Sequence, residues 1–282
     1  MRSVAAMLMW LITTVVLAAA LPAAWVQLHL VDRDGYSALA EKAAGDPRLQ
    51  SAMAGELTAQ VDRLGGTTDS TVVGGIAAVY TASSSFPGQF GQANAFAHRW
   101  LFTNNAGAAL DEQGRWVIDI APMLSDPAFA QTLRDYSITV PPSVPIPLTD
   151  EVSSVLRPGA LHDVGMWWPW ATVGLGVLVA CCALLMLYIS PSRGKALAAL
   201  GTSALPAGGT GWAAIEFGQK YVSRALDGTS GSIRTVADVM VATAQSSMHQ
   251  WLNLTLIAGG GLVVVGVIVS LLGGLSRPVS GR

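Results

Sequence analysis

Three long runs of apolar residues without a charged side chain constrain the fold of this chain more than any other feature. They extend from Ser3 to Val31, from Val164 to Ser192 and from Trp251 to Leu275. A helix of about 20 apolar residues spans the hydrocarbon core of a bilayer. The low share of charged residues, 12% against about 25% in soluble domains, agrees with this. The sequence therefore predicts a multi-pass membrane protein.

A fourth run, residues 196–217, is less apolar because it contains Pro206, several glycines and several hydroxyl side chains. We predict that it also spans the membrane, as the third of four spans. With the N-terminus in the cytoplasm, four spans leave Arg2, the turn at 192–195 and the tail at 276–282 inside. These pieces contain Lys and Arg but no acidic residue, as cytoplasmic segments near spans do.

An alternative with three spans places residues 194–250 in the cytoplasm, together with Lys220, Arg224 and Arg234. The positions of the tryptophans favour four spans, because aromatic residues gather at the membrane–water interface. Four spans bring six tryptophans to the outer interface: Trp25, Trp167, Trp168, Trp170, Trp212 and Trp251.

The first run, residues 1–31, is predicted to be a retained anchor. A cleaved signal peptide is the alternative, since Arg2 precedes the apolar stretch and small residues near Ala20 resemble a cleavage site. The apolar stretch continues through Val26, however, and exceeds the roughly 7–15 residues of a signal core.

Residues 32–163 form the predicted soluble domain, inserted between the first and second spans. They contain eight Lys or Arg and fifteen Asp or Glu, a local net charge of −7. With about 130 residues the segment is long enough to bury a core of its own. The four-span arrangement places it outside the cytoplasm, in a plasma membrane protein.

Local patterns predict a mainly α, or α+β, fold for this domain. A helix begins at Asp46-Pro47, where an acidic cap precedes a proline at the first helical position. Its apolar residues recur at helical spacing and predict a core stripe: Leu49, Met53, Leu57, Val61 and Leu64. The other predicted elements are a helix over 86–104, a helix from Asp126-Pro127, a turn at 111–114 feeding a strand over 116–120 in a short hairpin, an extended polyproline connector over 141–147 and a short helix over 150–156.

The segment 218–250 precedes the last span, residues 251–275, and is predicted to be an extracytoplasmic amphipathic loop. Apolar residues recur in it at roughly helical spacing, among them Val236, Val239 and Met240. It could lie as an amphipathic helix on the membrane surface. We favour packing against the outer domain.

The search for catalytic patterns is mostly negative. The sequence contains no phosphate-binding glycine loop, no nucleophile elbow and no zinc-protease motif, and its four histidines show no metal-ligand spacing. We therefore predict no catalytic, cofactor-binding or metal-binding residue. The net charge of −2 also argues against nucleic acid as a partner.

Seven residues remain as functional candidates: His98, Arg99, Trp100, His162, Asp163, Pro206 and Glu216. His98 could titrate near neutral pH, although a single histidine beside an arginine on an amphipathic helix is more often a structural hydrogen-bonding residue. His162 and Asp163 could form an acid–base pair, or simply a polar collar before the span. Pro206 with two nearby glycines could mark the broken helix of a transporter, with Glu216 at the outer end of the same span.

Four segments of this chain resemble predicted integral membrane proteins of actinobacteria. They are residues 25–36, the Asp46-Pro47 helix start, residues 95–98 and residues 117–124. The resemblance covers about two thirds of the chain and implies an N-terminal anchor, an extracytoplasmic domain and a C-terminal group of spans. It implies no activity, and relatives show an Asp-Thr-Asp type stretch where this chain has Asp32-Arg33-Asp34.

We expect a non-enzymatic membrane protein of the cell envelope, an accessory or scaffold subunit whose outer domain binds or positions a protein partner. Membrane lipid is the other expected partner. A component of a lipid or small-molecule transport system is the first alternative, and a membrane-bound enzyme is the second.

Overall fold

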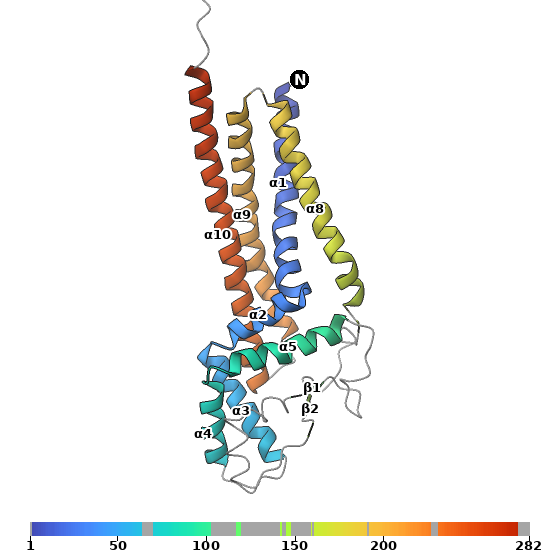
Figure 1. Ribbon diagram of the computed structural model, residues 1–282, viewed down its shortest axis with the longest axis vertical. Coiled ribbons are helices and arrows are strands. Elements are labelled where there is room, and N and C mark those ends of the chain that lie inside the picture. The colour runs from blue at the N-terminus through green and yellow to red at the C-terminus, as the bar shows by residue number, and fades with distance from the viewer. Residues whose placement is uncertain are drawn as a thin grey trace, which may run out of the picture. The chain divides into compact units, whose positions relative to one another are not determined.

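The computed structural model describes residues 2–63, 70–102, 117–119, 145–147, 161–190, 192–226 and 231–275, with Pro142 and Gly159. These residues form eight α-helices, one π-helical segment and two short strands (Figure 1). The helices are α1 (Arg2–Val26), α2 (Arg33–Ala43), α3 (Pro47–Arg63), α4 (Ser70–Thr81), α5 (Phe86–Phe102), α8 (His162–Ile189), α9 (Arg193–Ala225) and α10 (Gly231–Leu275). The π-helical segment is η1 (Gln27–Val31), and the strands are β1 (Val117–Asp119) and β2 (Pro145–Pro147).

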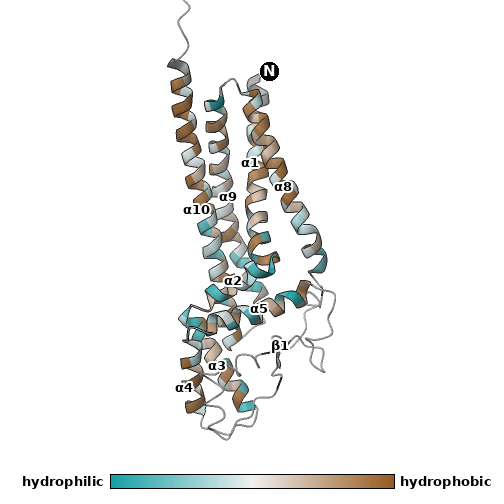
Figure 2. Cartoon of the chain, in the orientation of Figure 1, coloured by the Kyte–Doolittle hydropathy of each residue, from teal (hydrophilic) through white to brown (hydrophobic). Residues whose placement is uncertain are grey.

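Three helical stretches are long and apolar enough to span a membrane: Ala6–Val31, His162–Ile189 and Gly231–Leu272. Figure 2 shows apolar residues along α1, α8 and the second half of α10, whereas α9 is paler. The prediction of a helical chain with apolar helices long enough to span a membrane is thereby confirmed. The predicted fourth span falls on α9, which is helical throughout but not apolar enough to count among the three.

The chain divides into two compact units. The bundle unit contains Met1–Gln27, Trp168–Tyr221 and Gln245–Arg282, and the domain unit contains Leu28–Trp167 and Val222–Ala244. The helices α8, α9 and α10 each contribute residues to both units.

The domain unit has its core on α3, whose predicted start is confirmed. The carboxylate of Asp46 accepts a hydrogen bond from the backbone N–H of Arg48 at 2.8 Å, which satisfies a free donor in the first turn. The predicted apolar stripe is buried as far as the structure describes it, at Leu49, Met53, Leu57 and Val61. Side chains from α2, α4, α5 and α10 complete this core: Ala40, Ala43, Val73, Ala77, Tyr80, Phe86, Phe90 and Val239.

Most of the segment 218–250, predicted as an amphipathic loop with helical spacing, lies in the helices α9 and α10. The helix α9 continues to Ala225, and α10 already begins at Gly231 and runs for 45 residues. A salt bridge one turn apart, between Arg234 and Asp238 at 3.1 Å, supports the first turns of α10. Val239 is only 1% exposed and belongs to the domain core, so its apolar spacing reflects packing against the domain.

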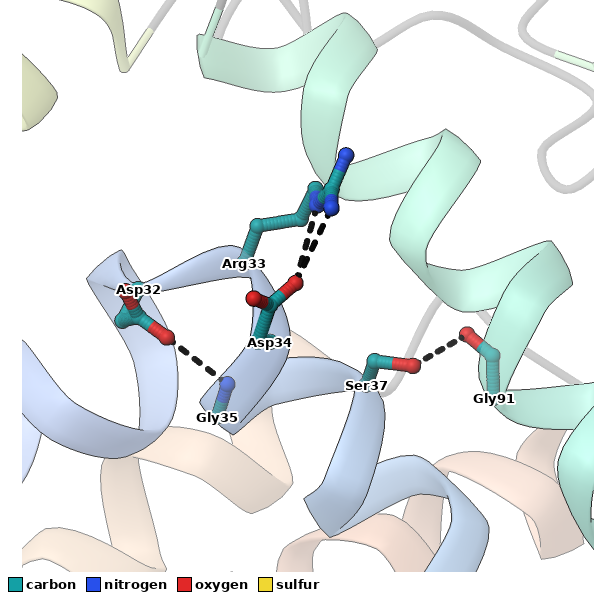
Figure 3. A network of polar contacts seen from close by, with 6 residues as sticks. All are labelled: Asp32, Arg33, Asp34, Gly35, Ser37 and Gly91. Atoms are coloured by element: carbon teal, nitrogen blue, oxygen red, sulfur yellow. Dashed lines mark hydrogen bonds and ion pairs between the residues drawn. The ribbon is translucent and has the colours of Figure 1, made fainter.

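Two helices of the domain unit were not among the sequence predictions. The helix α2 starts at Asp32, whose side chain accepts a hydrogen bond from the N–H of Gly35 at 2.9 Å, and Ser37 donates to the carbonyl of Gly91 on α5 at 2.9 Å (Figure 3). The backbone of Gly35 lies very close to the backbone of Leu28. A Cβ at Gly35 would collide with the carbonyl oxygen of Leu28, so this position requires glycine.

The helix α4 is the second element that the sequence did not indicate. Its sequence combines β-branched residues with Gly74 and Gly75, a composition of low helix propensity. Burial of Val73, Ala77 and Tyr80 in the core compensates for this. Tertiary packing therefore decides the conformation of α4.

The two strands pair with each other antiparallel, with Ile118 opposite Ile146. They are far apart in sequence, so this pairing is not a local hairpin, and the strand that would complete the predicted hairpin before the turn at 111–114 lies outside the described residues. The prolines also do not prevent Pro145–Pro147 from pairing, since a two-stranded sheet leaves one side of each strand free of backbone partners. Within the described residues only these six are in strands, so no β domain is present there.

Several other predictions lie outside the described residues. These are the turn at 111–114, the helix from Asp126-Pro127, the helix over 150–156 and the end of the first core helix at Leu64.

In the bundle unit, tryptophan and hydroxyl side chains connect the four long helices, which run side by side in Figure 1. Trp10 of α1 donates to the hydroxyl of Thr202 on α9 at 3.2 Å, and Trp25 donates to Ser247 on α10 at 3.3 Å. Trp168 of α8 donates to the carbonyl of Ala23 on α1 at 3.2 Å.

Glycines bring α9 and α10 close together, antiparallel. A Cβ at Gly194 would lie 2.6 Å from the carbonyl oxygen of Gly266, and one at Gly201 would lie 2.5 Å from that of Gly259. One heptad further, a Cβ at Gly208 would lie 2.7 Å from the side chain of Leu256. A seven-residue repeat of glycines, Gly194, Gly201 and Gly208, thus allows the two helices to pack closely.

The interpretation of Pro206 as a break in the helix is wrong. The helix α9 continues without interruption from Arg193 to Ala225 and contains Pro206 in its interior. Helices in membranes tolerate proline when neighbouring helices stabilise the chain around it, and Ala207 next to it is buried.

Candidate functional site

The last two turns of α5 hold the most chemically distinctive cluster in the domain unit. His98 is only 6% exposed, and its Nε2 lies 2.9 Å from the carbonyl oxygen of Leu30 in η1. Because a carbonyl oxygen only accepts, Nε2 carries the hydrogen of this bond. The histidine thereby connects α5 to the last turn of the first apolar helix.

Aromatic rings enclose His98. The ring of Phe102, one turn further along α5, stacks on the imidazole with a centroid distance of 4.2 Å, and the ring of Tyr36 on α2 lies at 5.3 Å. We call His98, Tyr36, Phe102 and His162 the His98 cluster.

The same end of α5 contacts the start of α8. The Nδ1 of His162 donates to the carbonyl of Phe102 at 3.2 Å, and the N–H of Leu161 donates to the carbonyl of Leu101 at 3.1 Å. A Cβ at Gly165 would lie 2.8 Å from the ring of Phe102. The end of α5 therefore contacts both the end of the first apolar helix and the start of the second.

Burial dominates the electrostatics of this cluster. It lowers the pKa of His98, although hydrogen bonding to the backbone of Leu30 and Val31 and the nearby carboxylate of Asp32 favour the charged form. Burial also raises the pKa of the Tyr36 phenol. Both rings are thus held in their neutral forms near pH 7.

The structure brings His98 and His162 into one cluster through Phe102. The remaining candidates beside them have other surroundings. Arg99 is exposed, with its guanidinium 5.7 Å from the centroid of the Phe96 ring. Asp163 is exposed on the first turn of α8, and the side chain of Trp100 lies outside the description.

Pro206 and Glu216 belong to α9 and to the bundle unit. Both are exposed, and no interaction that the structure describes joins them to the His98 cluster.

Sequence reasoning did not identify Tyr36 or Phe102 as partners of His98. The spacing of four residues between His98 and Phe102 is a usable signal, because side chains four apart on a helix are neighbours. No local pattern indicates Tyr36, which is more than sixty residues away from His98. Within the described part of the chain, no group of three or more His, Cys, Asp or Glu side chains has the geometry of a metal site.

No protein-family model, curated protein or solved structure matches this chain. The resemblance to actinobacterial membrane proteins therefore stays a prediction.

A second surface feature of the domain unit is a groove on α4. It has a volume of about 400 Å³ and is lined by Thr71, Val72, Gly75, Ile76, Val79, Tyr80 and Ser83. None of these side chains carries a charge, and Val79 is 75% exposed. A Cβ at Gly75 would meet no atom within 4 Å, so the backbone of α4 is open to close approach at this point.

Proposed function

We propose that this protein crosses the membrane four times and is an accessory subunit whose domain unit, on the extracytoplasmic side, binds a protein partner through the groove on α4. The proposal has two parts, the topology and the partner, and each rests on its own observation.

The topology is supported by the position of Val239 in the domain core. Residues 222–244 belong to the same unit as the start of α8 at His162, and α8, 28 residues long in all, is apolar enough to span a membrane. If α8 crosses the membrane, the chain has to cross back before it can place Val239 in that core. Among the described residues α9 is the one helix between them, so we assign the additional crossing to α9.

The contacts of α9 explain how a less apolar helix is accommodated in a membrane. Its glycines Gly194, Gly201 and Gly208 contact α10 along the stretch that runs from Leu256 to Ser270, which lies in the apolar second half of α10. Close helix approach through small residues favours association in lipid. In this arrangement α9 lies in the hydrocarbon core of the membrane, next to the apolar half of α10.

Cysteine labelling in intact cells tests this topology. In a background without Cys181 and Cys182, a membrane-impermeant maleimide is expected to label Ser51→Cys on α3 and Ser223→Cys after α9, but not Lys195→Cys. All three positions are exposed. If Ser223→Cys is protected like Lys195→Cys, the four-span proposal is wrong.

The uncharged exposed groove on α4 is the observation that supports partner binding. A contiguous apolar patch that remains exposed on a folded domain is typical of interaction sites. Because the groove has no charged lining residue, a charged partner would lose its hydration without compensation. An uncharged apolar segment of another protein fits the groove best.

A photo-crosslinking amino acid at position 79, with one at Ala38 on α2 as the control, tests the partner proposal in native membranes. Ala38 is also exposed but lies outside the groove. We expect a discrete protein adduct at position 79 that is absent at position 38. The Gly75→Leu substitution should lower the yield of this adduct at least about tenfold, since one unfavourable contact of about 1.4 kcal/mol weakens binding tenfold. Lipid adducts alone, or a protein adduct equally strong at both positions, would contradict the proposal.

A further inference from the structure

The end of α5 contacts both of the apolar helices that flank residues 32–163 in the sequence. His98 donates to Leu30 at the end of the first, and Phe102 accepts from His162 at the start of the second. A change at His98 thus affects a contact with the first helix directly and a contact with the second through Phe102.

The hydrogen bond of His98 defines its protonation state. With the hydrogen on Nε2, the neutral ring has no hydrogen on Nδ1. Protonation adds an N–H at Nδ1 and a positive charge to a side chain that is 6% exposed and stacked on Phe102. A buried charge of this kind is unfavourable unless it is fully paired.

We propose that His98 is an acid-sensitive latch, which holds the end of α5 against the ends of the two apolar helices when neutral and releases it when protonated. The proposal does not depend on a partner at α4 or on the number of spans.

The charged and titratable groups around His98 set the pH at which the latch opens. From α2, the carboxylate of Asp32 favours the charged ring and the guanidinium of Arg33 opposes it, while the phenol of Tyr36 is neutral. From α8, His162 faces the cluster through Phe102. On α5 itself, Arg99 follows His98 in sequence and is exposed.

The sign of the effect follows from the pKa of His98, which burial lowers below the value of 6.5 that the unfolded or released chain has. The released state then binds a proton more readily than the closed state. The contact is fully stable above pH 6.5 and weakens as the pH falls from there toward the lower pKa of the closed state.

Hydrogen exchange of the full chain in lipid nanodiscs between pH 8 and pH 5 tests the latch. After correction for the intrinsic exchange rate, we expect faster opening of residues 86–102 below about pH 6.5, by up to about tenfold per pH unit. Residues 47–63 of α3 are the internal reference, because their core does not contain His98. The His98→Gln variant keeps a donor for Leu30 but does not titrate, so the acid step should disappear.

Two further variants keep His98 and change its surroundings, which covers the case that His98→Gln does not fold. Arg33→Gln removes an opposing charge and should move the acid step to higher pH. Asp32→Asn keeps a helix-capping side chain and should move the step to lower pH. The proposal is overturned if the wild type shows no acid step, if α5 becomes more protected at low pH, or if these two variants leave the step unchanged.

Discussion

The close approach of α9 and α10 leads to a quantitative prediction for Gly201→Ala. A Cβ at Gly201 would lie 2.5 Å from the carbonyl oxygen of Gly259, whereas ordinary contact begins at 3.4 Å. The helices have to separate there by about 0.9 Å, a gap that removes a quarter to a half of the dispersion energy of each atom pair. Overpacking of this kind costs about 1–3 kcal/mol of stability.

Gly209→Ala is the matched control on the same helix, because a Cβ at Gly209 meets no atom within 4 Å. In both variants the higher helix propensity of Ala stabilises α9 by the same amount, up to about 1 kcal/mol. The difference between their free energies of unfolding therefore isolates the packing contribution. We expect Gly201→Ala to be less stable than Gly209→Ala by about 1–3 kcal/mol.

Unfolding of the full chain by SDS in mixed micelles, followed by far-ultraviolet circular dichroism, measures this difference. Gly194→Ala should behave like Gly201→Ala, since its Cβ would lie 2.5 Å from the backbone nitrogen of Ser270. Equal unfolding midpoints for Gly201→Ala and Gly209→Ala would refute the argument, because they would mean that α9 and α10 are not in close contact.

Three further changes concern the domain unit. Leu57→Ala should lower the free energy of unfolding by about 2–5 kcal/mol, because Leu57 is completely buried in the core; thermal unfolding measures this, and a loss below 1 kcal/mol contradicts the assigned core. Gly35→Ala should be far more destabilising than Gly88→Ala, because a Cβ at Gly35 collides with the backbone of η1 and one at Gly88 meets nothing; proteolysis of the two variants at equal concentration distinguishes them. Hydrogen bonds from Arg48 hold the pKa of the Asp46 carboxyl below its usual value of 3.8, so the capping contribution is present above pH 3.8 and is lost as the pH falls further. Removal of this carboxylate in Asp46→Asn should flatten the stability profile in that range, and an unchanged acid profile argues against the contribution.

Elements with a local cause could be predicted from the sequence. The start of α3 follows from the adjacent Asp46 and Pro47, and its buried face follows from residues three and four apart such as Leu49, Met53 and Leu57. Each of these signals lies within a few turns of one helix. For that reason neither depends on where the rest of the chain lies.

Elements whose stability comes from distant residues could not be predicted in the same way. The helix α4 contains Gly74 and Gly75, and only burial of Val73 and Ala77 against the other helices makes it favourable. The strand β2 pairs with a segment more than twenty residues earlier. The candidate site could not be predicted for the same reason, because the packing of α2 and η1 against α5 brings Tyr36 and Leu30 to His98.

The sequence by itself determined where three helices long and apolar enough to span a membrane lie, because hydropathy is a sum over neighbouring residues. The tertiary structure decided the continuity of α9 through Pro206, the inclusion of Val239 in the domain core and the surroundings of His98. These features depend on contacts between residues far apart in the chain, and the free energy of such contacts is fixed only when the folded chain brings them together.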